Sequence, residues 1–110
     1  MSVQIIVSQA GPLPIDVTFT AISDAPMVME VSGSVWSQGP GHLVGIGVAL
    51  DGNAIGQAQI WANPAATHLA VVPAYLPVQL AQGQHTLHLS RMTDNTMSDQ
   101  NDYYNVVLHY

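Results

Sequence analysis

The stretch MVMEVSGSVW, residues 27–36, decides the fold class of this 110-residue chain. Every second position from Met27 to Val35 is apolar apart from Gly33, and the positions between them are mostly polar. Successive side chains of a strand point to opposite faces, so this period of two predicts a strand with one buried face and not a helix. Gly33 falls on the apolar side and predicts a bulge or a close approach of another backbone.

Eight further runs of the same kind extend outward from this stretch, separated by Gly, Pro, Asn and Asp. They cover residues 3–8, 15–22, 43–50, 54–61, 68–72, 76–80, 85–92 and 103–110. Asp51-Gly52-Asn53 is a strong signal for the tight turn of a hairpin, and the apolar terminal run predicts a central strand. A short helical turn over residues 65–70 is the one helical alternative, and Pro73 would end it.

Eight to nine short strands in 110 residues predict one domain that spans residues 1–110. The fold class is all-β, an antiparallel β-sandwich or jelly roll, with a small barrel as a related alternative.

The surface of this domain is expected to carry very little charge. Asp, Glu, Lys and Arg make up 7% of the residues and hydrophobic residues 48%, whereas an average soluble domain is about 25% charged. A monomer normally solubilises its surface with charge, so we expect other subunits of a homo-oligomer to cover part of this surface.

Charge and cysteine content exclude several classes of partner. Seven acidic residues stand against a single base, Arg91, for a formal charge of −6. Binding to nucleic acid or to an anionic membrane surface needs several cations, so neither is expected. No apolar stretch is long enough to span a membrane, and the first residues lack the basic and apolar segments of a signal peptide. Without cysteine there is no disulfide or thiolate metal site, and the compartment stays open between the cytosol and a secreted location.

The stretch LPVQLAQGQHTLHL, residues 76–89, is followed by an acidic polar loop and an aromatic-rich terminal strand. This last third of the chain resembles compact jelly rolls of the C1q and tumour-necrosis-factor kind. The resemblance implies a trimer with ligand sites on outer loops or between subunits. The terminal strand departs from the pattern, because residues 104–107, YNVV, contain no glycine where that family usually has one.

Histidines and serines do not form a catalytic pattern. His85 and His88 are three residues apart, which places them on opposite faces of a strand and keeps them from ligating one ion together. No serine lies in a Gly-x-Ser-x-Gly turn, and Glu30 is the one glutamate. We therefore expect no catalytic residue, and a small metal-dependent β-barrel enzyme is the weaker alternative.

Residues 93–102, TDNTMSDQND, concentrate oxygen ligands of the kind that Ca²⁺ prefers. The candidate calcium ligands are Asp94, Asp99, Asn101 and Asp102. The alternative is an exposed hairpin loop in which Asp and Asn side chains bond to their own backbone.

Two tryptophans stand at predicted strand ends beside polar residues, as in a sugar site, where a ring stacks on a pyranose and amides bond its hydroxyls. The candidate ligand-binding residues are Trp36, His42, Trp61, Asn63 and His68. The alternative is that both rings belong to the core or to a subunit interface.

The sequence therefore predicts a non-catalytic, lectin-like binding module that recognises carbohydrate or another polar ligand through loops 36–42, 61–68 and 93–102. The alternative from another class is a structural or assembly subunit, such as a capsid-like, spore-surface or appendage protein, with no small-molecule ligand. The fold alone does not separate the two.

Overall fold

A computed structural model describes residues 2–110 and confirms the all-β prediction. Nine strands and no helix are present in this range. The strands are β1 (Val3–Ala10), β2 (Ile15–Ala21), β3 (Met27–Val35), β4 (His42–Leu50), β5 (Asn53–Ala62), β6 (Leu69–Ala70), β7 (Ala74–Val78), β8 (Gly83–Arg91) and β9 (Tyr103–His109). Residues 2–110 accordingly contain no helix that could cross a membrane.

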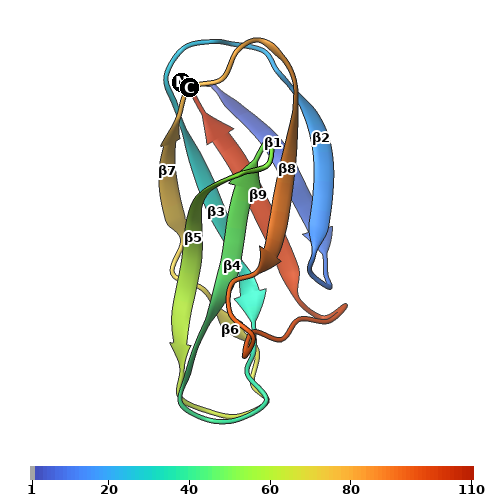
Figure 1. Cartoon of the computed structure of the whole chain (residues 1–110), viewed down its shortest axis with the longest axis vertical. Coiled ribbons are helices and arrows are strands. Elements are labelled where there is room, and N and C mark those ends of the chain that lie inside the picture. The colour runs from blue at the N-terminus through green and yellow to red at the C-terminus, as the bar shows by residue number, and fades with distance from the viewer. Residues whose placement is uncertain (1) are drawn as a thin grey trace.

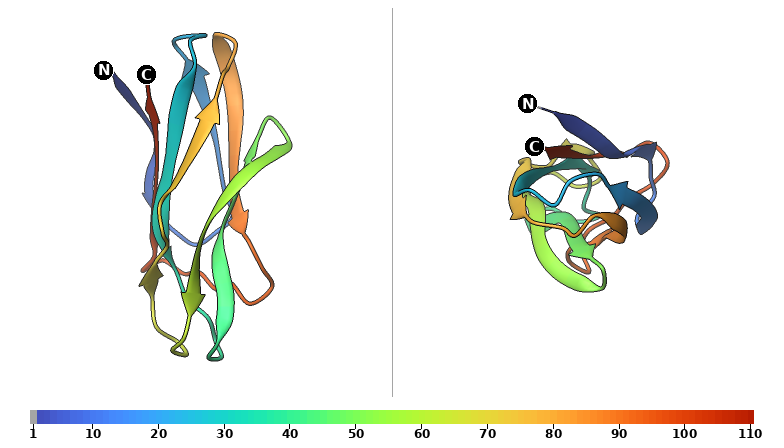
Figure 2. Two further views of the ribbon diagram at one scale, coloured as in Figure 1. Left: turned by 90° about the vertical axis from the view of Figure 1, so that its left-hand side faces the viewer. Right: turned by 90° about the horizontal axis from the view of Figure 1, so that it is seen from above.

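The strands form two antiparallel sheets that face each other as two layers (Figures 1 and 2). One sheet has the order β1-β9-β3, with β6 and β7 both pairing with the far side of β3. The other has the order β2-β8-β4-β5. With β6 and β7 taken as one interrupted strand, this is the eight-strand order of a jelly roll. As predicted, the terminal strand β9 is central, between β1 and β3.

Apolar side chains at alternate strand positions fill the space between the sheets, as the period of two requires. In β3 the buried positions are the predicted ones, Met27, Met29, Val31 and Val35. The predicted close approach at Gly33 is also present, because a Cβ there would lie 2.6 Å from the Tyr104 ring and 2.8 Å from the Tyr103 carbonyl oxygen.

The predicted hairpin turn joins β4 to β5. Asp51 and Gly52 both have positive φ, 51° and 83°, which is the backbone of the turn type that suits the strand twist of a hairpin.

Two predicted strands, 68–72 and 76–80, differ from the structure, which has β6 over only two residues and β7 shifted toward the N-terminus. Pro73 lies between them and has no N–H to donate. The Val71 N–H still bonds the Gly33 carbonyl, but the Val72 N–H bonds Gln59 of the other sheet. The chain therefore leaves β3 at this point and rejoins it as β7. The helical turn considered over residues 65–70 is absent from the described chain.

The loops after β3 and after β5 lie together at the lower end of the molecule (Figure 1). The Ala66 N–H bonds the Ser37 carbonyl, and the Gly41 N–H bonds the Ala62 carbonyl. This end of the sandwich holds the loops from which most of the candidate site residues come.

Candidate functional site

The outer face of the β2-β8-β4-β5 sheet presents a row of polar and aromatic side chains along β5. Ala58 and Ala62 are buried, and side chains alternate along a strand. The residues next to these alanines, Gln57, Gln59 and Trp61, therefore point outward. Trp61 is 54% exposed, and its indole Nε1 donates a hydrogen bond of 3.0 Å to Asn63 Oδ1. This bond restrains the ring of Trp61 at the surface, and it brings the sequence-predicted pair Trp61 and Asn63 together.

Strand β4 lies beside this row and contributes little bulk. Leu43 pairs in register with Trp61, Gly45 with Gln59 and Gly47 with Gln57. Gly45 is buried under the loop that follows β8, whose Met92 N–H bonds the Gly45 carbonyl. Gly47 stays on the outer face, where a Cβ would lie 2.8 Å from Ser90 Oγ.

A shallow cavity of about 310 Å³ opens on the same face, at the end of β8. Its lining residues are Pro14, His88, Ser90, Arg91, Thr93 and Asp94. Thr93 Oγ1 donates a hydrogen bond of 2.9 Å to the Leu43 carbonyl, and Leu43 pairs with Trp61. Leu43 of β4 therefore lies between the cavity and the exposed indole of Trp61.

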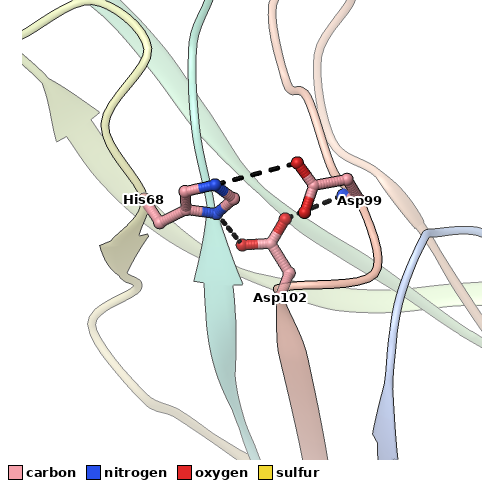
Figure 3. A group of neighbouring side chains, drawn as sticks. All are labelled: His68, Asp99 and Asp102. Carbon is pink, nitrogen blue, oxygen red and sulfur yellow. Dashed lines mark hydrogen bonds and ion pairs between the residues drawn. The ribbon is translucent and has the colours of Figure 1, made fainter.

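A second cluster lies between the loop after β5 and the loop that precedes β9 (Figure 3). His68 Nδ1 donates a 2.6 Å hydrogen bond to Asp102 Oδ1, and His68 Nε2 lies 3.7 Å from Asp99 Oδ2. The bond to Asp102 raises the pKa of His68 above its usual 6.5 because a carboxylate favours the imidazolium. The ring of Trp36 packs on this histidine at a centroid distance of 5.8 Å.

Asp102 is fully buried and its two carboxylate oxygens already have donors. Oδ1 accepts hydrogen bonds from His68 and from Ser34 Oγ at 2.7 Å, and Oδ2 accepts the Asp99 N–H at 2.8 Å. A ligand atom from each of His68, Asp99 and Asp102 lies within 4.8 Å of the others, so the group has the composition of a metal site. Its hydrogen bonds, however, satisfy Asp102 without an ion, and they tie two loops to β3.

The four candidate calcium ligands are not gathered at one point. Asp99 and Asp102 lie together with His68, whereas Asp94 lines the cavity beside Arg91. Asn101 contributes its backbone N–H, which bonds Asp99 Oδ1 at 2.8 Å in the local turn that was the alternative interpretation.

The five candidate ligand-binding residues fall into two pairs and a single residue. Trp36 packs on His68 and Trp61 bonds to Asn63, while His42 lies near Gly39. Sequence reasoning missed Gln57, Gln59 and the Arg91 cavity. The signal for the glutamines was present, because they stand two and four residues before Trp61 on a predicted strand.

Three more histidines pair with acids across neighbouring elements. His85 Nδ1 lies 2.6 Å from Asp51 Oδ2, His88 Nδ1 lies 2.6 Å from Asp16 Oδ1, and His109 Nε2 lies 2.8 Å from Glu30 Oε1. His85 and His88 point to opposite sides of β8, as their spacing predicted, and His85 packs on the ring of Phe19.

No protein-family model matches the sequence, and no curated protein matches it. Among solved structures, the chain is similar to part of dimeric latent PorU from Porphyromonas gingivalis, with a TM-score of 0.59 and 7% identity over 97% of this chain. The chain spans 12% of the PorU chain. It is also similar to the CBM36-1 domain of a multidomain xylanase from the hindgut metagenome of Trinervitermes trinervoides. The TM-score there is 0.48, with 11% identity over 99% of this chain and 98% of that one. At 7% identity the similarity to PorU concerns the fold alone. The likeness to C1q and tumour-necrosis-factor jelly rolls stays a prediction.

Proposed function

We propose that this chain is a non-catalytic carbohydrate-binding module whose ligand lies on the outer face of the β2-β8-β4-β5 sheet. The observation that carries the proposal is the exposed indole of Trp61, fixed by its hydrogen bond to Asn63. A rigid exposed ring is a stacking platform for the apolar face of a pyranose. A ring that served only the core would be buried, and this one is 54% exposed.

The neighbours of Trp61 suit a hydroxyl-rich ligand. Gln59 and Gln57 precede Trp61 in β5 and lie on the same face of the strand. Each is about 7 Å from the next, the distance between alternate strand residues. Gln57 Nε2 donates a hydrogen bond of 3.1 Å to Gln59 Oε1, which leaves further donors and acceptors of both amides directed to solvent. Amides that bond hydroxyls beside a stacking ring are the usual composition of a sugar site.

The remaining predicted residues take a supporting role in this proposal. Trp36 and His68 pack on each other, and His68 bonds to a buried carboxylate. They hold the loops after β3 and after β5 in place next to Trp61. His42 begins β4 at the same end of the sandwich.

The test is retardation of the protein in native gels that contain soluble polysaccharides such as xylan, glucomannan, galactan and pectin. We expect at least one polysaccharide to retard the wild-type protein and Trp61→Ala to abolish the effect, with a loss of about 2 kcal/mol, or about 30-fold in affinity. Tyr75→Ala is the matched control, because Tyr75 is an aromatic side chain with 62% exposure on the other sheet. Equal retardation of the wild type and Trp61→Ala would contradict the proposal, and so would no retardation by any of the polysaccharides.

A second candidate function, a structural or assembly subunit, is favoured by the outer face of the other sheet. Ile5 of β1 pairs in register with Val107, Val107 with Glu30, and Glu30 with Tyr75. Apart from Glu30 this row is apolar, and the exposed Val3 and Val28 extend it. A homo-oligomer, with a trimer favoured, would cover it. Light scattering tests this candidate: a mass of one chain at micromolar concentration would overturn it.

We also propose that Asp99 and Asp102 bind a calcium ion. Such an ion would compete with His68 for Asp102 Oδ1. A melting temperature that rises with calcium and falls again with a chelator supports the ion, and an unchanged melting temperature removes it.

A further inference from the structure

Arg91 is the single permanently charged cation of the sequence, and no carboxylate within residues 2–110 forms an ion pair with it. Its guanidinium donates one long hydrogen bond, from Nη1 to the Thr96 carbonyl at 3.5 Å. Five of the seven acids lie within 4 Å of a histidine nitrogen instead. The chain thus leaves its one guanidinium available to a ligand, at the wall of the cavity beside Leu43.

The other residues of the cavity favour a sugar over a bare anion. Ser90 offers a hydroxyl and Asp94 an acceptor for the hydroxyls of a ligand, whereas Thr93 Oγ1 already donates to the Leu43 carbonyl and can only accept. The Asp94 carboxylate and the net charge of −6 repel any anion, so an anionic ligand needs hydroxyl contacts as well in order to bind here. A ligand with one carboxylate and several hydroxyls can bond both the guanidinium of Arg91 and the other polar side chains of the cavity.

The size and position of the cavity agree with a single sugar residue next to a longer chain. About 310 Å³ is at the lower end of the volumes of small-molecule sites. Thr93, a lining residue, bonds Leu43, which lies opposite Trp61. A glycan that stacks one residue on Trp61 would therefore pass over Leu43 to reach the cavity.

We infer that the glycan is acidic, and that Arg91 binds the carboxylate of a uronic acid residue whose hydroxyls contact Ser90, Thr93 and Asp94. This inference rests on the proposed function and narrows it to one class of ligand. The planar guanidinium matches a carboxylate with two parallel hydrogen bonds, which a lysine cannot do.

Calorimetric titration of the full chain with oligogalacturonate and with its methyl ester tests the inference, because the ester keeps the shape of the sugar and removes its charge. We expect the wild type to bind the acid at least about tenfold more tightly than the ester, the range for a hydrogen bond to a charged group. Arg91→Gln should bind acid and ester equally, and Arg91→Lys should fall between. Gln82→Glu is the control, since it makes a change of the same sign to the net charge at an exposed position between β7 and β8.

The outcomes separate this inference from the function on which it rests. If the wild type binds acid and ester equally, and Trp61→Ala binds neither, the glycan proposal stands and the role of Arg91 is wrong. If Arg91→Gln and Gln82→Glu weaken binding of the acid equally, the effect is one of net charge and the inference also fails. Binding of neither oligosaccharide by the wild type overturns it as well.

Discussion

Asp102 is a carboxylate with no exposed surface in a chain that has a single arginine and no lysine. A buried carboxylate persists only when donors replace the water that it loses. Ser34, His68 and the Asp99 N–H supply them from β3 and from the loops after β5 and before β9. At the scale of single residues, the Asp102 side chain thus joins β3 to both of these loops.

The substitution Asp102→Asn tests the contribution of this side chain. An amide nitrogen in place of one oxygen cannot accept a hydrogen bond, so either the Asp99 N–H or the shared site of Ser34 and His68 loses its acceptor. We expect the free energy of unfolding to fall by about 2–3 kcal/mol in urea titrations. Asp24→Asn, the same change at an exposed position, should stay within about 0.5 kcal/mol of the wild type. An equal effect of both substitutions would show that Asp102 is not the anchor.

Among the elements, β3 and β9 leave no room for a side chain where Gly33 faces Tyr104. These strands pair in register from Val28 with His109 to Gly33 with Tyr104. Tyr104 is fully buried, its hydroxyl bonds Ser98 Oγ at 2.6 Å, and burial raises its pKa to about 12. The large ring fits between the sheets because residue 33 has no Cβ.

Alanine at position 33 is therefore expected to destabilise the domain. Its Cβ would overlap the Tyr104 ring, and the nearby Tyr103 carbonyl is backbone that cannot rotate away. Overpacking of this kind costs about 1–3 kcal/mol, measurable as a lower urea midpoint. Ser32→Ala, one residue away on the outer face of β3, provides the comparison and should change little. A Gly33→Ala protein as stable as the wild type would mean that the two strands can separate at no cost.

The strand pattern was predictable because a period of two is local to each strand, as in residues 27–35 and 43–50. Which strands pair with each other was not predictable, because the pairing of β4 with β8 joins residues about 40 positions apart. The Arg91 cavity depends on that pairing. Trp61 and Asn63 were found because they are neighbours in the chain. His68 was assigned to a sugar site, because nothing local indicates that it meets Asp102 34 residues later.

For the whole molecule, histidine side chains are the main side-chain partners of the acids. The formal charge is −6 with neutral histidines, and protonation of all five would bring it to −1. In His85 both ring nitrogens face acceptors, Asp51 Oδ2 and the Ala81 carbonyl, so the doubly protonated ring fits best. The hydrogen bond to Asp51 raises the pKa of His85, and the same bond lowers the pKa of Asp51.

Stability should consequently be greatest in mild acid. A raised histidine pKa stabilises the fold fully below the unfolded value of 6.5, and that stabilisation is lost as the pH rises through the folded value. The lowered pKa of Asp51 stabilises the fold above pH 3.8, and this stabilisation is lost in stronger acid. We expect a higher melting temperature at about pH 5.5 than at about pH 8.5. A His68→Gln, His85→Gln protein should lose most of this difference, and a flat profile in the wild type would refute the role of the pairs.

The central claim is that a glycan stacks on Trp61, and the two indole N–H signals in a nitrogen–proton correlation spectrum test it most directly. Trp61 Nε1 bonds Asn63 at the surface, whereas Trp36 Nε1 is buried and has no hydrogen-bond partner among residues 2–110. On addition of a polysaccharide fragment that retards the protein, we predict that the Trp61 indole and the Gln57 and Gln59 side-chain amides shift and saturate, while the Trp36 indole stays in place. Shifts confined to Trp36, or to residues of the β1-β9-β3 sheet, would contradict the account.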